Sequence, residues 1–468
     1  MTKIEPQVKM REQSISERLK NFSEVPLGYN EAEAVREAGR CLQCSTSPCI
    51  KGCPVSIDIP AFIRLIREKK FLEAAGVLKE SNSLPAICGR VCPQEDQCEK
   101  ACLLHKQGKA IAIGYLERFV SDYERAKKKI YVPRIKARKK EKIAIIGSGP
   151  SGLTCAGELR KMGYQVTIFE ALHQGGGVLS YGIPEFRLPK EIVRQEIDYV
   201  RELGVEIKCN MVIGKIYTVE ELLKQGFSAV YIATGAGCPS FMDIPGENLN
   251  YIYSSNEFLT RINLMKAYAF PQYDTPVKIG KKTAVIGGGN TAMDSARAAL
   301  RLGPEKVYLI YRRSSEEMPA RIEEIHRAEE EGVEFQLLTL PVEFMADKDG
   351  NIRGMYCQRM KLGEKDKSGR RRPIPIPGSE FEIEVNSVVV AIGTKANPLV
   401  PETTNALKLN ERGYIMVDES GQTSRPEVFA GGDIVSGSAT VIKAMGTAIT
   451  AAGAIDKYLR MRLEIPPF

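Results

Sequence analysis

Eight of the twelve cysteines of the chain lie within residues 41 to 102, and their spacing is the first sign of chemistry in the sequence. The first group is CLQCSTSPCIKGCP, residues 41 to 54, and the second is CGRVCPQEDQCEKAC, residues 88 to 102. Such grouping is compatible with a disulfide framework, a zinc site, a redox thiol pair or an iron–sulfur ligand set. The other four are scattered and are expected to be ordinary core or surface residues.

The expected compartment narrows these alternatives. No apolar run approaches the roughly 18 residues that span a bilayer. The first twenty residues also lack the apolar centre of a signal peptide. We therefore expect a cytoplasmic protein without a membrane segment. Because the cytoplasm is reducing, a disulfide framework is disfavoured, and no thioredoxin-like strand accompanies the cysteines to support a redox thiol pair.

Lysine and arginine are concentrated in one segment, residues 125 to 142, of a chain whose formal net charge is +8. We interpret this segment first as a solvated linker between domains. A docking surface for an acidic partner is the second interpretation. Nucleic-acid binding ranks last, because helix-turn-helix and zinc-finger spacings are absent. We therefore expect no nucleic-acid partner.

The elements that must position these motifs change in character along the chain. Residues 11 to 124 show apolar residues at three- and four-residue spacing, which predicts helices with the cysteines at helix ends and in loops. After about residue 138, short β-branched runs alternate with glycine loops and helical segments, which is typical of parallel α/β units. With 468 residues, the chain is long enough for roughly three domains. We expect a helical domain at residues 1–138, followed by two Rossmann-like dinucleotide-binding folds.

The first dinucleotide motif is KIAIIGSGPSGLTCAGELRKMGYQVTIFE, residues 142 to 170. A predicted buried strand runs into Gly147, Gly149 and Gly152, and a helix and a second strand ending at Glu170 follow. Glycines at these positions allow backbone N–H groups to approach a pyrophosphate at the start of the helix. Glu170 is placed to accept hydrogen bonds from ribose hydroxyls.

A second motif, KKTAVIGGGNTAMDSARAALRLGPEKVYLIYRR, covers residues 281 to 313. Gly287, Gly289 and Asn290 lie at its predicted loop and helix start, where a dinucleotide is expected to bind. Its second strand ends at Arg312 and Arg313 rather than at an acidic residue. Guanidinium groups there favour the 2′-phosphate of NADP over NAD, and a plain surface arginine pair is the alternative.

Together the motifs GSGPSG, ATG, GGGNTAMD, AIG and AGGD resemble those of the glutathione-reductase-like flavoproteins over residues 140 to 468. The resemblance implies an FAD-binding domain at 139–270 and 392–468 and an NADPH-binding domain inserted at 271–391. It also implies that the late GGD motif, with Gly432 and Asp433, meets the flavin's ribityl and pyrophosphate region. Neither fold carries the CxxC pair of the disulfide reductases, so electrons need another route.

The two cysteine groups are the candidates for that route. Each contains a Cys-Pro, and two such groups favour iron–sulfur clusters that exchange ligands over zinc sites. A helical domain of this pattern joined to FAD and NADPH folds resembles one family. That family includes glutamate synthase small subunits, the N-terminal part of dihydropyrimidine dehydrogenase and the large subunit of NADH-dependent reduced ferredoxin:NADP oxidoreductase.

The resemblance implies two [4Fe–4S] clusters and a ligand set for each. The implied cysteine ligands are Cys41, Cys44, Cys49 and Cys102 for one cluster, and Cys53, Cys92 and Cys98 for the other. In the family the missing fourth ligand can be a non-cysteine residue of an IxIGxLxxF segment, and IAIGYLERF here places Glu117 there. Cys88 is the alternative. A carboxylate ligand would shift the cluster's potential away from that of an all-thiolate cluster.

Two further segments resemble parts of the family's flavin and nicotinamide sites. SYGIPEFRLPK, residues 180 to 190, resembles a segment near the isoalloxazine. Arg187 in it is our candidate for stabilising a reduced, anionic flavin, with a structural salt bridge as the alternative. RRSSEEMPAR, residues 312 to 321, is expected to flank the nicotinamide site, and we assign it no separate role.

The spacing in CPQEDQC resembles that of the ferredoxin:NADP subunit within this family. The resemblance implies hydride exchange between NADP(H) and FAD and one-electron transfer through the clusters to or from ferredoxin. It also implies a smaller flavin and iron–sulfur partner subunit that reduces NAD, with electron bifurcation. The alternatives are the small subunit of NADPH-dependent glutamate synthase and a sulfide dehydrogenase subunit. A non-catalytic iron–sulfur protein that binds nucleic acid is disfavoured by the two dinucleotide motifs.

Overall fold

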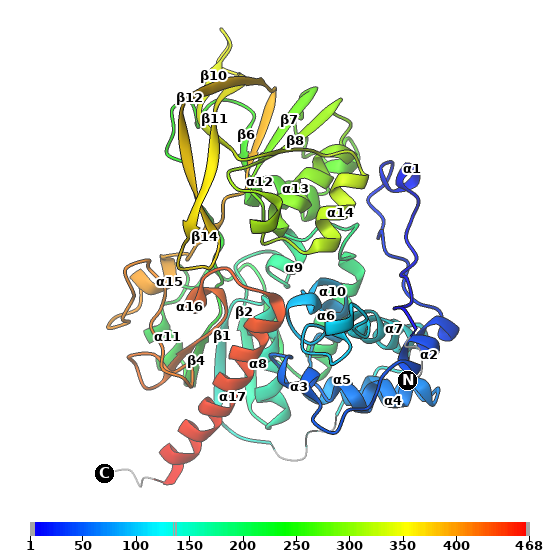
Figure 1. Cartoon of the computed structure of the whole chain (residues 1–468). Helices are drawn as coiled ribbons and strands as arrows, with labels where there is room; N and C mark the ends of the chain where they lie inside the picture. The colour runs from blue at the N-terminus through cyan, green and yellow to red at the C-terminus, as the bar shows by residue number, and fades with distance from the viewer. Residues whose placement is uncertain (1–4, 134, 136–137, 465–468) are drawn as a thin grey trace.

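The chain folds into a helical domain and two Rossmann domains (Figure 1). The structure is a computed structural model that describes residues 5–133, 135 and 138–464. The helical domain lies beside the first Rossmann domain, and the second Rossmann domain lies above both in the view of Figure 1. This arrangement confirms the expected fold class.

Helices dominate the N-terminal domain, as the spacing of apolar residues predicts. They are α1 (Ile15–Arg18), α2 (Glu31–Gly39), α3 (Pro48–Lys51), α4 (Ile59–Arg67), α5 (Phe71–Ser81), α6 (Pro85–Val91) and α7 (Ile113–Ala126), with short 3₁₀ turns at Gln94–Asp96 and His105–Gln107. Asn30 caps α2 by accepting from Glu33 N–H, and Asp58 caps α4 by accepting from Ala61 N–H. Pro60 lies in the first turn of α4, where a missing N–H leaves no hydrogen bond unmade. Most of the grouped cysteines therefore lie at helix ends and in loops.

The first Rossmann domain contains a parallel sheet in the order β15-β4-β1-β2-β3. Its strands are β1 (Lys142–Ile146), β2 (Gln165–Phe169), β3 (Glu206–Lys208), β4 (Phe227–Ile232) and β15 (Val428–Ala430). Its helices are α8 (Pro150–Lys161), α9 (Val178–Tyr181), α10 (Lys190–Glu202), α11 (Val219–Lys224), α15 (Leu399–Glu402), α16 (Asp433–Ser436) and α17 (Val441–Glu464). α17 packs against α8 through small buried residues such as Ala448 and Ala452. These contacts share one core with the helical domain.

The second Rossmann domain repeats this design with the parallel order β6-β13-β7-β8-β9. Its strands are β6 (Ile252–Ser254), β7 (Lys282–Ile286), β8 (Lys306–Tyr311), β9 (Glu334–Leu337) and β13 (Ser387–Val390). Its helices are α12 (Ser255–Asn263), α13 (Asn290–Arg301) and α14 (Ile322–Glu330), with 3₁₀ turns at Ala267–Ala269 and Ser315–Glu317. β10 (Thr339–Ala346), β11 (Ile352–Lys365) and β12 (Arg371–Glu384) form an antiparallel sheet beside it.

The expected boundary at residue 271 differs from the observed pairing. Ile252 and Ser254 of β6 pair with Val388 and Val390 of β13, so β6 and the following α12 lie in the second Rossmann domain, although residues up to 270 were expected in the first. The chain crosses between the domains earlier, at a short antiparallel pair formed by β5 (Cys238–Pro239) and β14 (Thr394–Lys395). On the return side, β13 ends at Val390 and β14 begins at Thr394, and the expected boundary at 392 lies between these two strands.

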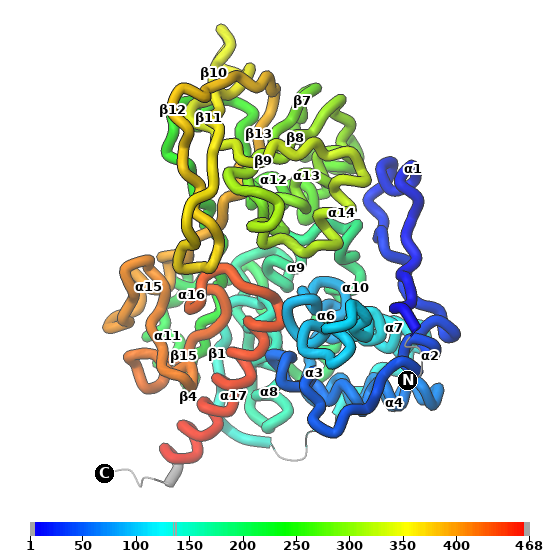
Figure 2. Tube along the Cα trace, in the orientation of Figure 1, coloured from blue at the N-terminus to red at the C-terminus, as the bar shows by residue number. Residues whose placement is uncertain are grey.

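An N-terminal arm, residues 11 to 27, leaves the helical domain and lies along the second Rossmann domain near α14 (Figure 2). The ring of Phe22 stacks on Tyr268 with centroids 4.3 Å apart. Arg18, which is buried, forms an ion pair of 3.0 Å with the fully buried Glu331. The arm therefore fixes the position of the second Rossmann domain relative to the helical domain.

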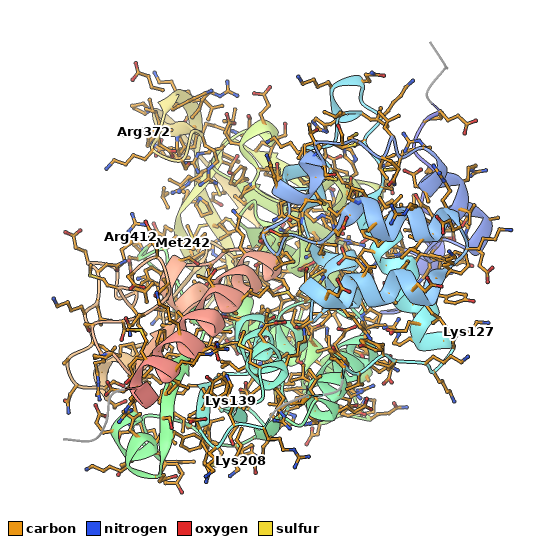
Figure 3. The ribbon with its side chains drawn as sticks, turned by 90° about the horizontal axis from the view of Figure 1, so that it is seen from below. Lys127, Lys139, Lys208, Met242, Arg372 and Arg412 are labelled. Carbon is orange, nitrogen blue, oxygen red and sulfur yellow. The ribbon has the colours of Figure 1, made fainter. Side chains whose placement is uncertain are left out.

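The basic segment at residues 125 to 142 connects the helical domain to β1, and residues 134, 136 and 137 lie outside the described part. Figure 3 shows Lys127 beside the helical domain and Lys139 beside the first Rossmann domain. Lys139 pairs with Asp456 of α17 at 2.5 Å. Within the residues that the structure describes, no helix is both long and apolar enough to cross a bilayer.

Candidate redox site

Four of the grouped cysteines surround one cavity, which we call the outer cavity. Its lining includes the cysteines Cys41, Cys44, Cys49 and Cys102, and most of its other walls are apolar. Leu42 and Leu103 also line it and are 54% and 52% exposed, so the outer cavity lies close to the surface. Four thiols around one apolar cavity could hold a [4Fe–4S] cluster, because each iron of such a cluster takes one thiolate.

Three other cysteines and a carboxylate surround a second cavity, which we call the inner cavity. Its ligand candidates are Cys53, Cys92, Cys98 and Glu117. All four side chains are buried, so this cavity is less accessible to water than the outer one. Ile59 and Ile113 line both cavities. The two candidate cluster sites are therefore neighbours that share these two wall residues.

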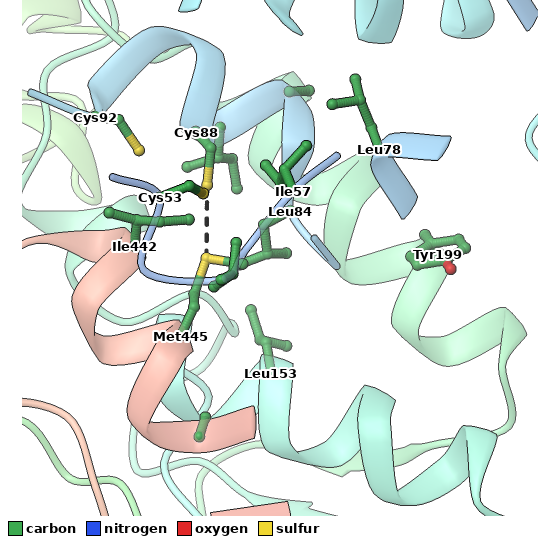
Figure 4. Close-up of a cluster of buried hydrophobic side chains, with 14 of the residues drawn as sticks. Cys53, Ile57, Leu78, Leu84, Cys88, Cys92, Leu153, Tyr199, Ile442 and Met445 are labelled. Carbon is green, nitrogen blue, oxygen red and sulfur yellow. Dashed lines mark hydrogen bonds between the residues drawn. The ribbon is translucent and has the colours of Figure 1, made fainter. Parts of the chain in front are cut away.

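Glu117 and Cys88, the alternative fourth ligands, are placed differently. Glu117 lines the inner cavity, and its Oε1 accepts a hydrogen bond of 2.7 Å from Nδ2 of Asn82. Burial raises the pKa of Glu117 to about 8. Cys88 lies one helical turn before Cys92, and the interaction with that thiol raises the pKa of Cys88. Its Sγ lies 3.5 Å from Sδ of Met445, on the side of α17 (Figure 4). Glu117 thus lines the inner cavity and Cys88 is not among its lining residues, and the role of Glu117 as fourth ligand stays a prediction.

The arrangement of the thiols around a cavity is compatible with an iron–sulfur cluster. Among the described residues, no three His, Cys, Asp or Glu side chains converge closely enough to hold one ion. Zinc needs its four ligands within about 2.0–2.3 Å of one centre. An iron–sulfur cluster spreads its ligands over several irons, so the ligands can stand around a cavity without meeting at a point.

Helix α17 joins the inner cavity to the first Rossmann domain. Ile442, in its first turn, lines the inner cavity. One turn later, a Cβ on Gly446 would lie 2.8 Å from the carbonyl oxygen of Pro54, the residue after Cys53. A side chain at Gly446 would push α17 away from the cysteine loop. Figure 4 shows Ile442 and Met445 of α17 facing Cys53 and Cys88.

The glycine loop of the first Rossmann domain has the geometry expected for a pyrophosphate. Gly147 has φ +101°, and a Cβ there would lie 2.5 Å from the carbonyl oxygen of Ala233. A Cβ on Gly152 would collide with the carbonyl oxygen of Gly147, whereas Gly149 faces open space at the start of α8. Glu170, which is buried, accepts from Ser148 N–H at 3.0 Å. Its carboxylate thus holds the loop, and its role toward a ribose stays a prediction.

The late GGD turn lies against the same glycine-loop helix. A Cβ on Gly432 would lie 2.9 Å from Cβ of Ser151 in the first turn of α8. Asp433 follows and accepts from Ala439 N–H at 3.1 Å. Burial raises the pKa of Asp433 to about 6. One ligand could therefore contact both the α8 N-terminus and Asp433, as FAD is expected to do.

The second glycine loop repeats this geometry. A Cβ on Gly287, whose φ is +144°, would lie 2.3 Å from the carbonyl oxygen of Ala391. Gly289 faces open space at the start of α13 and is followed by Asn290. The Oδ1 atom of Asn290 accepts from Arg321 N–H at 3.0 Å. This loop could hold the second dinucleotide.

Arg312 and Arg313 have different surroundings, which the sequence does not reveal. Arg313 is buried, donates to the Arg371 carbonyl at 2.8 Å and pairs with Asp366 at 2.9 Å. Arg312 is exposed and has no hydrogen bond or ion pair with any described residue. Partial desolvation and the nearby charges of Arg313 and Arg370 lower the pKa of Arg312. Arg312 is thus the freer candidate for a 2′-phosphate, and Arg370 is a neighbouring cation that sequence reasoning missed.

Arg187 forms a buried ion pair that links the two Rossmann domains. Its Nη1 lies 2.8 Å from Oδ2 of Asp294 in α13, and its Nε lies 3.9 Å from Glu324 in α14. This geometry supports the structural salt bridge that was the alternative interpretation. The expected role of Arg187 toward a reduced flavin stays a prediction.

Substitutions at the two open glycines are expected to separate the two nucleotide sites. Gly149→Val should abolish FAD retention, and Gly289→Val should retain FAD and lose NADP(H) binding. Both residues have extended backbone at negative φ, and a Cβ atom there would meet no protein atom within 4 Å outside the neighbouring residues, so we expect both variants to fold. Flavin absorbance and NADP⁺ titration measure the two effects. Gly453→Val, also facing open space, is the control, and equal losses in all three variants would contradict the assignment.

Two family models match the chain in the order of these domains. Residues 18–129 match dihydropyrimidine dehydrogenase domain II, 4Fe-4S cluster, and residues 134–452 match pyridine nucleotide-disulphide oxidoreductase. The chain therefore belongs to the pyridine nucleotide-disulphide oxidoreductase family and carries an N-terminal 4Fe-4S domain of the dihydropyrimidine dehydrogenase type.

Named relatives include subunits of several enzymes. The beta subunit of NADP(+)-dependent formate dehydrogenase of Moorella thermoacetica is 42% identical over 90% of the chain. The beta subunit of NADPH-Fe(3+) oxidoreductase of Geobacter sulfurreducens is 39% identical over 88%. The chain spans 61% and 64% of the lengths of these two relatives. The small chain of glutamate synthase [NADPH] of Escherichia coli is 34% identical, with 94% of each chain covered.

Solved structures share the fold of the Rossmann domains. FprA of Mycobacterium tuberculosis in complex with NADPH aligns with a TM-score of 0.59 at 21% identity, over 70% of this chain and 86% of that one. Thioredoxin reductase of Lactococcus lactis aligns with a TM-score of 0.51 at 21% identity, over 69% of this chain and all of that one.

Proposed function

We propose that the chain is an NADPH-dependent flavin and iron–sulfur oxidoreductase subunit that holds FAD, NADP(H) and two [4Fe–4S] clusters. The observation that carries the proposal is that the two cluster cavities and the candidate flavin site are neighbours in the fold. The outer and inner cavities share the walls Ile59 and Ile113, and Ile442 of α17 also lines the inner cavity. α17 begins eight residues after Asp433 of the GGD turn. A single helix start thus connects the candidate flavin site to the candidate clusters.

The bound groups would supply hydride exchange between NADP(H) and FAD and one-electron transfer through the clusters. The residues of the chain bind, orient and exclude water. The glycine loops at Gly149 and Gly289 would seat the two pyrophosphates at helix N-termini, and Arg312 would bind the 2′-phosphate of NADP. The buried inner cavity would keep water from its cluster. This exclusion of water and the Glu117 carboxylate would give the inner cluster a reduction potential different from that of the outer cluster.

We infer that ferredoxin exchanges electrons at the outer cavity, because that cavity lies near the surface with Leu42 and Leu103 exposed beside it. A smaller flavin and iron–sulfur subunit that reduces NAD would complete the complex, with electron bifurcation between the two acceptors. Two relatives are named as beta subunits, which supports function within a complex. A cytoplasmic, reducing location suits the unpaired thiols.

The direct test uses the complex purified anaerobically from its own cells. Ferredoxin reduction by NADPH is measured with and without NAD. Reduction only in the presence of NAD supports bifurcation, because the favourable branch then drives the unfavourable one. Reduction that is indifferent to NAD contradicts bifurcation and leaves an NADPH-dependent electron donor.

The small subunit of NADPH-dependent glutamate synthase is the second candidate. It is favoured by the glutamate synthase small chains of Escherichia coli and Halomonas elongata, each of which aligns over 94% of both chains. This function predicts copurification with a large amidotransferase. It also predicts NADPH-dependent formation of glutamate from glutamine and 2-oxoglutarate. Absence of that activity in the purified complex would exclude it.

A further inference from the structure

The segment at residues 312 to 321 is attached to the second glycine loop. Ala320 N–H donates to the carbonyl oxygen of Gly288 at 3.3 Å, and Arg321 N–H donates to Oδ1 of Asn290 at 3.0 Å. Both acceptors belong to the loop and helix start where a dinucleotide is expected to bind. Any shift of this loop on binding therefore acts on the backbone of Arg321.

The side chain of Arg321 crosses from the second Rossmann domain into the helical domain. It is 6% exposed. Nη1 donates to the carbonyl oxygen of Arg90 at 3.2 Å, and Nη2 donates to Oε1 of Gln94 at 3.1 Å. Nε lies 3.3 Å from Oε1 of Glu95. Within its own domain Nη2 also lies 3.3 Å from Glu323. A planar guanidinium with this many partners is held in one orientation.

Gln94 continues the connection to the inner cavity. It lines that cavity together with Cys92, Cys98 and Glu117. Its Nε2 donates to the carbonyl oxygen of Cys88 at 3.2 Å. A Cβ on Gly114 would lie 2.2 Å from the same Nε2 atom, so Gln94 packs tightly on the first turn of α7, the helix that carries Glu117. Gln94 therefore contacts both α6, which ends just before Cys92, and α7, which carries Glu117.

We propose that Arg321 is a positioning residue that couples nucleotide occupancy of the second Rossmann domain to the inner cluster cavity. The inference rests on the proposed function, because it requires that NADP(H) and the inner cluster bind where described. Nucleotide binding at the glycine loop repositions Arg321, and Arg321 repositions Gln94 and the 90–95 segment beside the ligands. Because coupling between two sites is reciprocal, the redox state of the inner cluster changes the affinity for NADP⁺ in turn.

Another buried arginine of the same region offers a matched control. Arg327, in α14, pairs with Glu12 of the N-terminal arm at 2.7 Å and with Glu324 at 2.6 Å. It also links the second Rossmann domain to the N-terminal part of the chain. It shares the partner Glu323 with Arg321, at 3.6 Å, but none of its ion pairs with described residues reaches the glycine loop or the lining of the inner cavity. Its loss should weaken the attachment of the domains without removing the specific connection through Arg321.

The experiment titrates 2′-phospho-ADP-ribose into the anaerobically purified full chain, first oxidised and then reduced with dithionite. This ligand has the pyrophosphate and 2′-phosphate of NADP⁺ but no nicotinamide to take a hydride from the reduced flavin. The readouts are its dissociation constant and the electron paramagnetic resonance spectrum of the reduced inner cluster. We expect the dissociation constant to differ by about fivefold or more between the two states and the ligand to alter the inner-cluster spectrum. Arg321→Gln should bind the ligand and show neither effect, whereas Arg327→Gln should show both.

Arg321→Lys serves if Arg321→Gln does not fold. Its ammonium keeps a buried positive charge beside Glu95 and Glu323 but lacks the rigid planar fork that fixes Arg90 and Gln94 relative to each other, so the coupling should still be lost. If the unsubstituted chain binds the ligand and both clusters but neither affects the other, the coupling proposal is wrong and the proposed function stands. Full coupling in Arg321→Lys would likewise contradict only the coupling proposal. Absence of NADP⁺ binding or of clusters in the unsubstituted chain overturns the proposed function itself.

Discussion

Glu117→Ala is expected to remove the inner cluster, so that iron falls from about eight to about four atoms per chain, since each [4Fe–4S] cluster holds four. Cys88→Ala is expected to leave the iron content unchanged. The reason is position, because Glu117 lines the inner cavity with three cysteines, whereas Cys88 points its Sγ toward Met445. Iron and acid-labile sulfide assays on anaerobically purified variants measure the difference.

A third variant makes the comparison sharper. Glu117→Cys should restore about eight irons and change the spectrum of only one cluster, because a thiolate replaces a carboxylate at a single ligand position. The opposite pattern, with iron lost in Cys88→Ala and retained in Glu117→Ala, would assign the fourth position to Cys88. In that case the Asn82–Glu117 hydrogen bond of 2.7 Å would be a packing contact only.

Arg312→Glu is expected to lower kcat/KM for NADPH roughly 100-fold, because lost charge-assisted hydrogen bonds cost about 1.5–3 kcal/mol and each tenfold corresponds to about 1.4 kcal/mol. The introduced carboxylate also repels the 2′-phosphate, so activity with NADH should rise relative to NADPH. Arg312 is suited to this role because it has no partner among the described residues, whereas Arg313 is held by Asp366. Reduction of a dye acceptor by each nucleotide measures the preference.

Arg412→Glu is the matched control for this change. Arg412 is exposed in the first Rossmann domain, and its substitution alters the net charge by the same amount. It should leave both nucleotides' kinetics unaltered. An unchanged NADPH preference in Arg412→Glu and Arg312→Glu alike would refute a phosphate-binding role for Arg312 and direct attention to Arg370.

The sequence predicts the fold class because glycine loops, buried strands and helix spacing are local signals. The boundary at 271 was misplaced because β6 has only three residues, and its pairing with β13 joins positions 136 residues apart. Arg313 was predicted to face the nucleotide, but its partner Asp366 lies 53 residues away in the β11–β12 hairpin. Such contacts arise from tertiary packing, so the spacing of residues along the chain does not predict them.

The residues of the candidate site could likewise be predicted from the sequence only in part. Cysteine spacing together with the family resemblance anticipated the residues around each cavity, and the cavities bring together the expected groups. Asn82, Gln94 and Arg321 were missed. Asn82 ends a helix, which is an ordinary place for asparagine, and its contact with Glu117 appears only once α5 and α7 pack together. Arg321 contacts residues of the helical domain, so the sequence motif around it does not predict its partners.

The most direct test of the account is the composition of the chain purified without oxygen. Two cavities with one [4Fe–4S] cluster each, beside one flavin domain, predict about eight irons, about eight acid-labile sulfides and about one FAD per chain. The account also predicts that NADPH bleaches the flavin absorbance. Two zinc ions without labile sulfide, or a chain that retains no flavin, would contradict it.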